Sequence, residues 1–101
     1  MRIIARKTIK GFALSHPQAK GPLDSWFNEA IHAEWVTSSD IKNRFPSASF
    51  LKDNRVVFNI GGNKYRLLCR IRYEVGIIYI LFVGTHAEYD GIDAATYRYR
   101  S

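Results

Sequence analysis

The sequence predicts an α+β domain in which two N-terminal helices pack on one face of an antiparallel sheet of three to four strands. Apolar residues recur at three- and four-residue spacing in the first third of the chain, which is typical of amphipathic helices. From residue 55 onward the apolar residues alternate with other residues, which is typical of strands. Residues 61–63, Gly-Gly-Asn, favour a hairpin turn because they adopt positive φ angles readily. With helices on one face only, we expect the opposite face of the sheet to be free.

Length and composition indicate one globular domain over residues 1–101. The chain is 47% hydrophobic and 24% charged, which is ordinary for a globular protein and unlike a disordered segment. Its single cysteine, Cys69, excludes an intramolecular disulfide and leaves too few thiols for a structural zinc site, so we expect an inert strand residue. The first residues, MRIIARKTIK, lack the apolar core of a signal peptide, and no run reaches transmembrane length. We therefore expect a cytoplasmic protein that does not contact a membrane.

The chain is strongly basic, and this charge limits the classes of partner. Fifteen lysines and arginines outnumber nine aspartates and glutamates, which gives a formal net charge of +6. An anionic partner is expected: nucleic acid, a ribosome or an acidic protein. Charge alone does not choose among them.

A short strand and two helices are expected in the N-terminal third. Residues 2–5 are consistent with a strand, and Thr8 with the N-cap of a helix over Ile9–His16 that Pro17 ends. A second helix then begins near Pro17 with an irregular first turn, because Pro22 falls early in it. Its apolar stripe, which we assign to the core, contains Leu23, Trp26, Phe27, Ala30, Ile31 and Trp35.

A shorter helical turn is expected before the sheet. Ser38, Ser39 and Asp40 offer caps for a turn over residues 41–44. Pro46 limits this turn, because the residue before a proline disfavours the helical conformation.

Three strands follow, and the middle one has faces of opposite character. The first covers residues 55–60, and the third, an apolar run over residues 77–83, has the composition of a strand covered on both faces. Alternation in the middle strand, residues 65–73, places on one face Tyr65, Leu67, Cys69, Ile71 and Tyr73. It places on the other face Arg66, Leu68, Arg70 and Arg72. The third strand exits beside this basic face, where we expect Gly84 to leave room next to His86.

Several segments of the chain resemble the HigB branch of the RelE-like toxins. They are the hairpin GGNKYRLL, the strand exit FVGTHAEYD, and the segments FPSASFL and RVVFNI, and similarity extends over nearly the whole length. The resemblance implies a compact RelE-like fold, a toxin of a type II toxin–antitoxin pair, and ribosome-dependent, metal-independent cleavage of mRNA. It also implies a HigA-like helix-turn-helix antitoxin as partner. Superfamily members differ in their acid and base residues, and this chain follows the members that use a histidine near the C-terminus, at His86.

The residues at the strand exit also suit RNA cleavage on chemical grounds. Attack by the 2′-hydroxyl needs a base at that hydroxyl, a cation at the phosphate and an acid for the departing 5′-oxygen. His86 is either the natural proton carrier near neutral pH or a structural histidine at the strand end. Arg66 either clamps phosphate through parallel hydrogen bonds or is a solvated strand residue. Glu88 and Asp90 either orient His86, act as base or cap the next turn. Tyr89 either stacks on a base, donates a proton or closes the edge of the core.

Five further residues are candidates for contacts with RNA: Asn59, Asn63, Lys64, Arg70 and Arg72. Asn63 and Lys64 belong to the hairpin tip, where they either contact phosphate or base or stay solvated. Arg70 and Arg72 continue the face of Arg66, and we expect them to steer the RNA backbone. No HExxH or CxxC spacing and no glycine-rich phosphate loop occur, so we expect neither a metal nor a cofactor.

Three classes of function remain open on the sequence. They are an endoribonuclease toxin, a non-catalytic module that binds RNA or DNA, and an interaction domain whose basic face receives an acidic protein. His86 favours the first class, because binding alone does not require a proton carrier beside the arginines. A short helix-turn-helix protein encoded in the adjacent reading frame would favour the toxin further.

Overall fold

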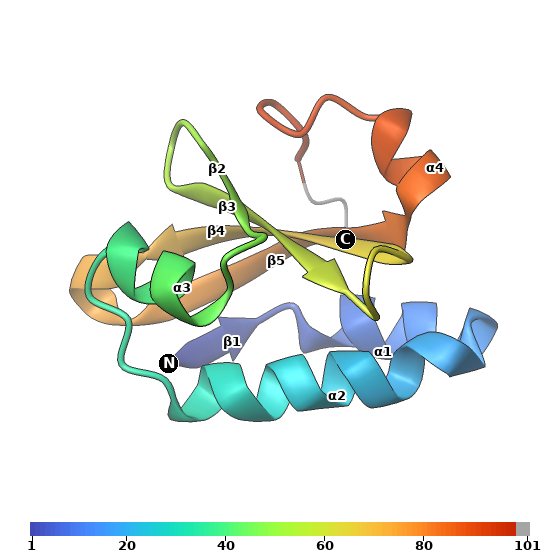
Figure 1. Cartoon of the computed structure of the whole chain (residues 1–101), viewed down its shortest axis with the longest axis horizontal. Helices are drawn as coiled ribbons and strands as arrows, with labels where there is room; N and C mark the ends of the chain where they lie inside the picture. Colours follow the sequence, from blue (N-terminus) through green and yellow to red (C-terminus); the bar gives the residue numbers. More distant parts are fainter. Residues whose placement is uncertain (99–101) are drawn as a thin grey trace.

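The computed structural model describes residues 1–98, which form a five-stranded mixed sheet with helices on both sides (Figure 1). In chain order the elements are β1 (Arg2–Ile4), α1 (Arg6–Ser15), α2 (Pro17–His32), α3 (Ser38–Arg44), β2 (Ser49–Leu51), β3 (Arg55–Ile60), β4 (Tyr65–Arg72), a 3₁₀ turn (Tyr73–Val75), β5 (Ile77–Thr85) and α4 (His86–Asp90). The strand order across the sheet is β1-β5-β4-β3-β2. Helices α1 and α2 cover one face, whereas α4 and the segment after it lie on the other side (Figure 1).

The α+β class and the central β3–β4–β5 meander are confirmed, but the edges of the sheet differ from the prediction. The described residues form five strands instead of three to four, and the sheet is mixed because β1 runs parallel to β5. Three helices and three strands lie between β1 and β5 in the sequence, so no hairpin sets the direction of β1. β2 pairs with β3 over only three residues, too few for alternation to reveal it in the sequence.

The helix starts are partly corrected. Thr8 is not the N-cap of α1; the helix begins at Arg6, because Ala5 adopts a left-handed conformation with a φ of 72° and turns the chain at once. Helix α2 begins at Pro17 as predicted and contains Pro22. Trp35 lies beyond the end of α2 but is still buried in the core.

Helix α3 is longer than predicted because its cap lies further upstream. Thr37 is the N-cap, and the Asp40 carboxylate accepts hydrogen bonds from the backbone N–H groups of Val36 and Thr37 at 2.8 and 3.1 Å. This reciprocal capping starts the helix at Ser38.

The main core lies between the sheet and helices α1, α2 and α3. The apolar face predicted for β4 is confirmed, since Tyr65, Leu67, Cys69 and Ile71 are all buried in it. Burial raises the pKa of the Cys69 thiol well above its usual value, which agrees with an inert strand residue.

The opposite face of the sheet is not free, contrary to expectation. Val57 and Leu68 form a second, smaller cluster there, which the chain after α4 covers with Ala94. The Arg55 guanidinium fastens this segment by donating hydrogen bonds to the carbonyls of Ala94 and Tyr97 at 2.8 and 2.7 Å. The apolar residues on this face explain the cover, because leaving them exposed would forfeit hydrophobic burial.

A β-bulge in β5 sets the direction of its last residues. Leu68 pairs with Phe82, and the next residue of β4, Cys69, pairs with Ile80, so Leu81 has no partner in this register. Leu81 and Phe82 consequently both pack against the second cluster. From Phe82 onward the side chains of β5 again point alternately to the two faces of the sheet, one residue out of phase with the side chains before the bulge.

Candidate active site

The β3–β4 hairpin forms one end of the candidate site. Gly61 and Gly62 adopt φ angles of 64° and 73°, which glycine takes without strain. This turn leaves Asn63 and Lys64 exposed at the tip. The Asn59 amide, on β3, donates a hydrogen bond to the Ser47 carbonyl at 3.1 Å and so helps to hold the segment before β2.

Arg66 lies on β4, which is flanked by β3 and β5. Its register partners are Asn59 on β3 and Gly84 on β5. One guanidinium nitrogen donates hydrogen bonds to the carbonyls of Asn63 and Tyr65, at 3.1 and 3.3 Å. Within residues 1–98 no carboxylate pairs with Arg66, so donors of its guanidinium remain available for an anion.

Helix α4 begins immediately after β5 and is tied to the hairpin. The His86 N–H donates to the Lys64 carbonyl at 3.2 Å, which holds the first turn of α4 beside the hairpin tip. Thr85 is the N-cap: its N–H donates to Glu88 Oε1 at 2.7 Å, and its hydroxyl accepts from the Glu88 N–H at 3.2 Å. One oxygen of the Glu88 carboxylate is thus engaged in capping.

His86 and Asp90 form the titratable pair of the site. His86 Nδ1 lies 3.1 Å from Asp90 Oδ2, one helical turn away, and the two side chains are 54% and 63% exposed. A carboxylate at Nδ1 favours the tautomer that carries the proton there, which leaves Nε2 to accept a proton from a substrate. This pairing exists only because α4 is a helix, in which residues four apart share a face.

Tyr89 and Gly84 have packing roles at this end of the sheet. Tyr89 is half-buried and packs against the second cluster. Gly84 does not leave open room beside His86, contrary to expectation. A Cβ atom at position 84 would lie 2.6 Å from Phe82 Cζ and 3.1 Å from the Glu88 Cβ. Residues 82 and 84 share a face of β5, and the Phe82 ring fills the space beside Gly84.

Gly84→Ala should therefore destabilise the protein by about 1–3 kcal/mol, because the Phe82 ring must move to admit a methyl group. Chemical denaturation measures the change in the free energy of unfolding. Gly11→Ala is the matched control, since a Cβ at Gly11 meets nothing within 4 Å and the residue lies in helix α1. Equal stabilities of the Gly84→Ala and wild-type proteins would contradict this account.

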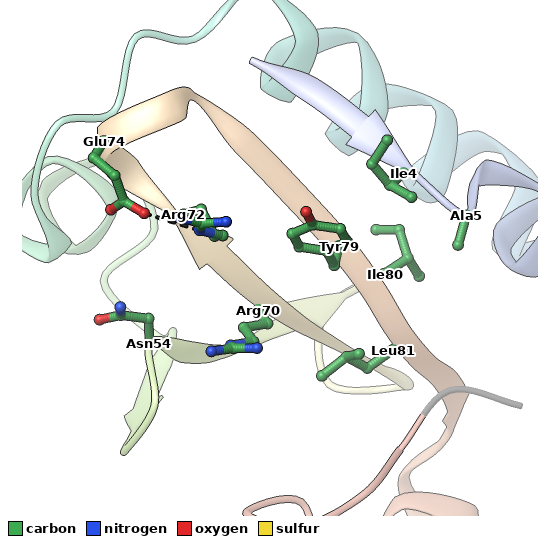
Figure 2. A pocket seen from close by; sticks show the side chains of 9 residues that line it. All are labelled: Ile4, Ala5, Asn54, Arg70, Arg72, Glu74, Tyr79, Ile80 and Leu81. Atoms are coloured by element: carbon green, nitrogen blue, oxygen red, sulfur yellow. Dashed lines mark hydrogen bonds and ion pairs between the residues drawn. The ribbon is translucent and has the colours of Figure 1, made fainter.

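Arg70 and Arg72 lie apart from this end of the sheet. Arg70 lies four positions after Arg66 on β4, which corresponds to about 13 Å. The two arginines line a separate hollow of about 600 Å³, together with Asn54, Tyr79 and Leu81 among others (Figure 2).

The hollow is basic but contains one acid. Arg72 Nε pairs with Glu74 Oε1 at 2.9 Å. The pKa of Glu74 is lowered by a hydrogen bond from the backbone of Glu74 itself and by this pairing with Arg72. In the register of the sheet Arg70 lies opposite Arg55. Two like charges in cross-strand positions repel each other, so this face favours an anion.

The structure thus divides the sequence-predicted residues into two groups. The hairpin end gathers Asn59, Asn63, Lys64, Arg66, His86, Glu88, Tyr89 and Asp90, whereas Arg70 and Arg72 belong to the separate hollow. Sequence reasoning missed Thr85 as the helix cap, although the spacing Thr-x-x-Glu is a recognisable capping signal. It also missed the clamp made by Arg55, for which the sequence holds no local signal.

No three His, Cys, Asp or Glu side chains within residues 1–98 are grouped so that they could hold a metal ion. Over the same residues, none of the helices combines the length and the apolar character needed to cross a membrane.

Comparison with known proteins agrees with the predicted resemblance. Residues 19–92 match the family model HigB_toxin, described as the RelE-like toxic component of a toxin-antitoxin system. Similar curated proteins are the mRNA interferase toxin HigB of Escherichia coli strain K12 and the proteins named mRNA interferase HigB from Escherichia coli O157:H7 and Shigella flexneri. Each is 35% identical over 92 residues, which cover 89% of this chain and 88% of the relative. The chain therefore belongs to the HigB family of RelE-like toxins, the toxic components of toxin–antitoxin systems.

Proposed function

We infer that this toxin is an mRNA endoribonuclease, as its relatives are named, and we propose that it cuts translated mRNA on the ribosome by attack of the 2′-hydroxyl on the adjacent phosphate. Family membership supports the toxin and an antitoxin partner. The basic surface supports an RNA substrate. Because translating ribosomes are in the cytoplasm, we propose that the protein acts there.

The pairing of His86 with Asp90 at the hairpin end is the observation that carries the proposal. A module that only binds RNA has no need of an imidazole oriented by a carboxylate at 3.1 Å. In the proposed reaction His86 Nε2 takes the proton of the 2′-hydroxyl, whose oxygen bonds to the phosphorus as the bond from phosphorus to the 5′-oxygen breaks. The departing 5′-oxygen receives a proton from water, and Asp90 orients the imidazole ring. Arg66, whose register partner Gly84 lies two residues before His86, stabilises the charge that develops on the phosphate.

The exposure of His86 bears on the requirement for the ribosome. Its side chain is 54% exposed, so residues 1–98 do not enclose His86 in a pocket that would hold RNA in a reactive geometry. Proximity and orientation are a large part of catalysis, and here we propose that the ribosome supplies them by presenting the mRNA in a fixed path.

The remaining site residues have supporting roles in this proposal. Asn63 and Lys64 contact the RNA from the hairpin tip, where they are exposed, and Asn59 supports that end through its hydrogen bond to Ser47. Glu88 and Tyr89 act by holding α4 in place, through the N-cap and through packing. Arg70 and Arg72 bind the RNA backbone at a distance from the scissile bond.

We further propose that the antitoxin is a HigA-like helix-turn-helix protein encoded beside the toxin. The sequence resemblance supports this type of antitoxin, and the family description supports an antitoxin in general.

Mapping of mRNA 5′ ends after induced expression tests the proposed reaction. New 5′ ends are expected within translated regions, and they should be absent from messages whose start codon has been removed, because untranslated RNA is not presented by the ribosome. Cells arrested by a translation inhibitor without the toxin are the control for growth arrest itself. Growth arrest by the toxin with an unchanged map of 5′ ends would refute cleavage.

A further inference from the structure

The outer surface of the α1–α2 pair contains a groove that the proposed reaction does not use. It has a volume of about 550 Å³, and residues from both helices line it, including Arg6, Lys10, Leu14, Lys20, Asp24 and Phe27. The residues assigned above to catalysis and RNA contacts are not among the lining residues.

The groove has an apolar component that the fold does not explain. Leu14 is 85% exposed and belongs to neither apolar cluster. Beside it lie Ala13, the buried Ile9 and the half-buried Phe27. Leu14 therefore contributes no burial to the isolated chain, although a leucine at a protein contact contributes substantially.

The rim of the groove carries a surplus of positive charge. Lys20 pairs with Asp24 at 2.7 Å, which neutralises the acid among the lining residues. The Arg6 guanidinium lies 4.0 Å from the centroid of the Phe27 ring. Within residues 1–98 neither Arg6 nor Lys10 forms an ion pair, so both cations are available to carboxylates of a partner.

The spacing of the lining residues on α1 and α2 suits the packing of a third helix into the groove. Arg6, Lys10 and Leu14 follow one another at four-residue spacing on α1, and Lys20 and Asp24 do so on α2. Rows at this spacing form the ridges between which another helix packs. A nucleic acid offers no aliphatic side chains to cover Leu14, whereas an amphipathic helix does.

We propose that this groove is the docking site of the antitoxin, and that its occupant is an acidic, amphipathic helical segment. Apolar side chains of that segment cover Leu14 and Phe27, and its carboxylates face Arg6 and Lys10. The proposal rests on membership of a toxin–antitoxin family and not on the cleavage reaction.

Calorimetric titration with the protein encoded by the adjacent antitoxin gene tests this surface. Leu14→Asp and Lys10→Glu are each expected to weaken binding by about ten- to a hundred-fold, because they place negative charge in the groove and Leu14→Asp also removes its apolar contact. Val36→Asp and Lys52→Glu are the matched controls, since both native side chains are exposed outside the groove, and these variants should bind as the wild type does. Melting temperatures check that all four variants fold.

A cysteine at position 14 gives an independent readout. In a Leu14→Cys protein the new thiol should react rapidly with an alkylating reagent, and the antitoxin should slow that reaction at least about tenfold. Cys69 is fully buried and does not compete.

Unchanged affinity and unchanged alkylation in the presence of the antitoxin would overturn the proposal. Loss of ribosome or RNA binding at Leu14→Asp with normal antitoxin affinity would also overturn it, since the groove would then serve RNA. Cleavage by the groove variants without antitoxin is expected to equal that of the wild type, so failure of the proposed reaction and failure of the docking site are distinguishable.

Discussion

His86→Gln is expected to lower the single-turnover rate of mRNA cleavage by about a hundred- to ten-thousand-fold, the usual contribution of a general acid or base. Glutamine retains a hydrogen-bonding group near Asp90 but cannot carry a proton at neutral pH. The fold should survive, because the His86 side chain is more than half exposed and contacts Asp90 rather than the core. Antitoxin binding should be unchanged as well. Ribosome-bound mRNA mixed with excess toxin provides the measurement.

The matched control is His32→Gln. His32 is also exposed, and its Nδ1 is 2.8 Å from the Asn28 carbonyl on α2, away from the hairpin end. This variant should cleave at the wild-type rate. A lowered melting temperature of His86→Gln with cleavage near the wild-type rate would assign a structural role to His86, and a stable, fully active variant would remove His86 from the mechanism.

Arg66→Ala is expected to reduce the cleavage rate by about a hundred- to a thousand-fold, which is typical for the loss of one group that stabilises transition-state charge. Its effect on ribosome binding should be much smaller, because the contact is proposed to strengthen in the transition state. Arg66→Lys keeps the charge but loses the paired donors, so it should recover only part of the rate. Melting temperatures check the loss of the hydrogen bonds to Asn63 and Tyr65.

Arg72→Ala separates steering of the RNA from chemistry. Arg72 lines the separate hollow with Arg70, away from the hairpin end. Its loss should weaken RNA binding and lower the slope of log affinity against log salt concentration by about one, with little change in the cleavage rate of bound RNA. If Arg66→Ala reduced binding and rate by the same factor, Arg66 would be a steering charge like Arg72.

The central meander was predictable because its signals are local. Alternation over residues 55–60 and 65–73 and the glycine turn between them define two strands and their faces without any knowledge of the rest of the chain. The start of α1 was not predictable in the same way, because an alanine at position 5 carries no signal for a left-handed conformation.

The parts of the site that depend on long-range contacts were harder to predict. His86 could be placed at the strand exit from its neighbours in sequence, and its pairing with Asp90 follows once α4 is known to be a helix. Gly84 was misinterpreted because the ring of Phe82, two residues earlier on the same face of β5, fills the space beside it, and the sequence carries no signal for where that ring points. The segment that covers Val57 and Leu68 contains Ala94 and lies some 30 residues further along the chain, and no periodicity in the sequence predicts this contact.

The bulge at Leu81 gives β5 one residue more than the part of β4 with which it pairs. Because the bulge already accommodates one extra residue, deletion of Leu81 would leave Phe82, Val83 and Gly84 with their present partners and on their present faces. Insertion of a further residue there would instead exchange the faces of Val83 and Gly84 and rotate the start of α4 relative to β4. A substitution at the same place changes only one side chain. A chimaera that joins two such toxins within β5 can therefore lose the unpaired residue and keep its faces, whereas one additional residue between Ile80 and His86 would turn Val83 out of the core.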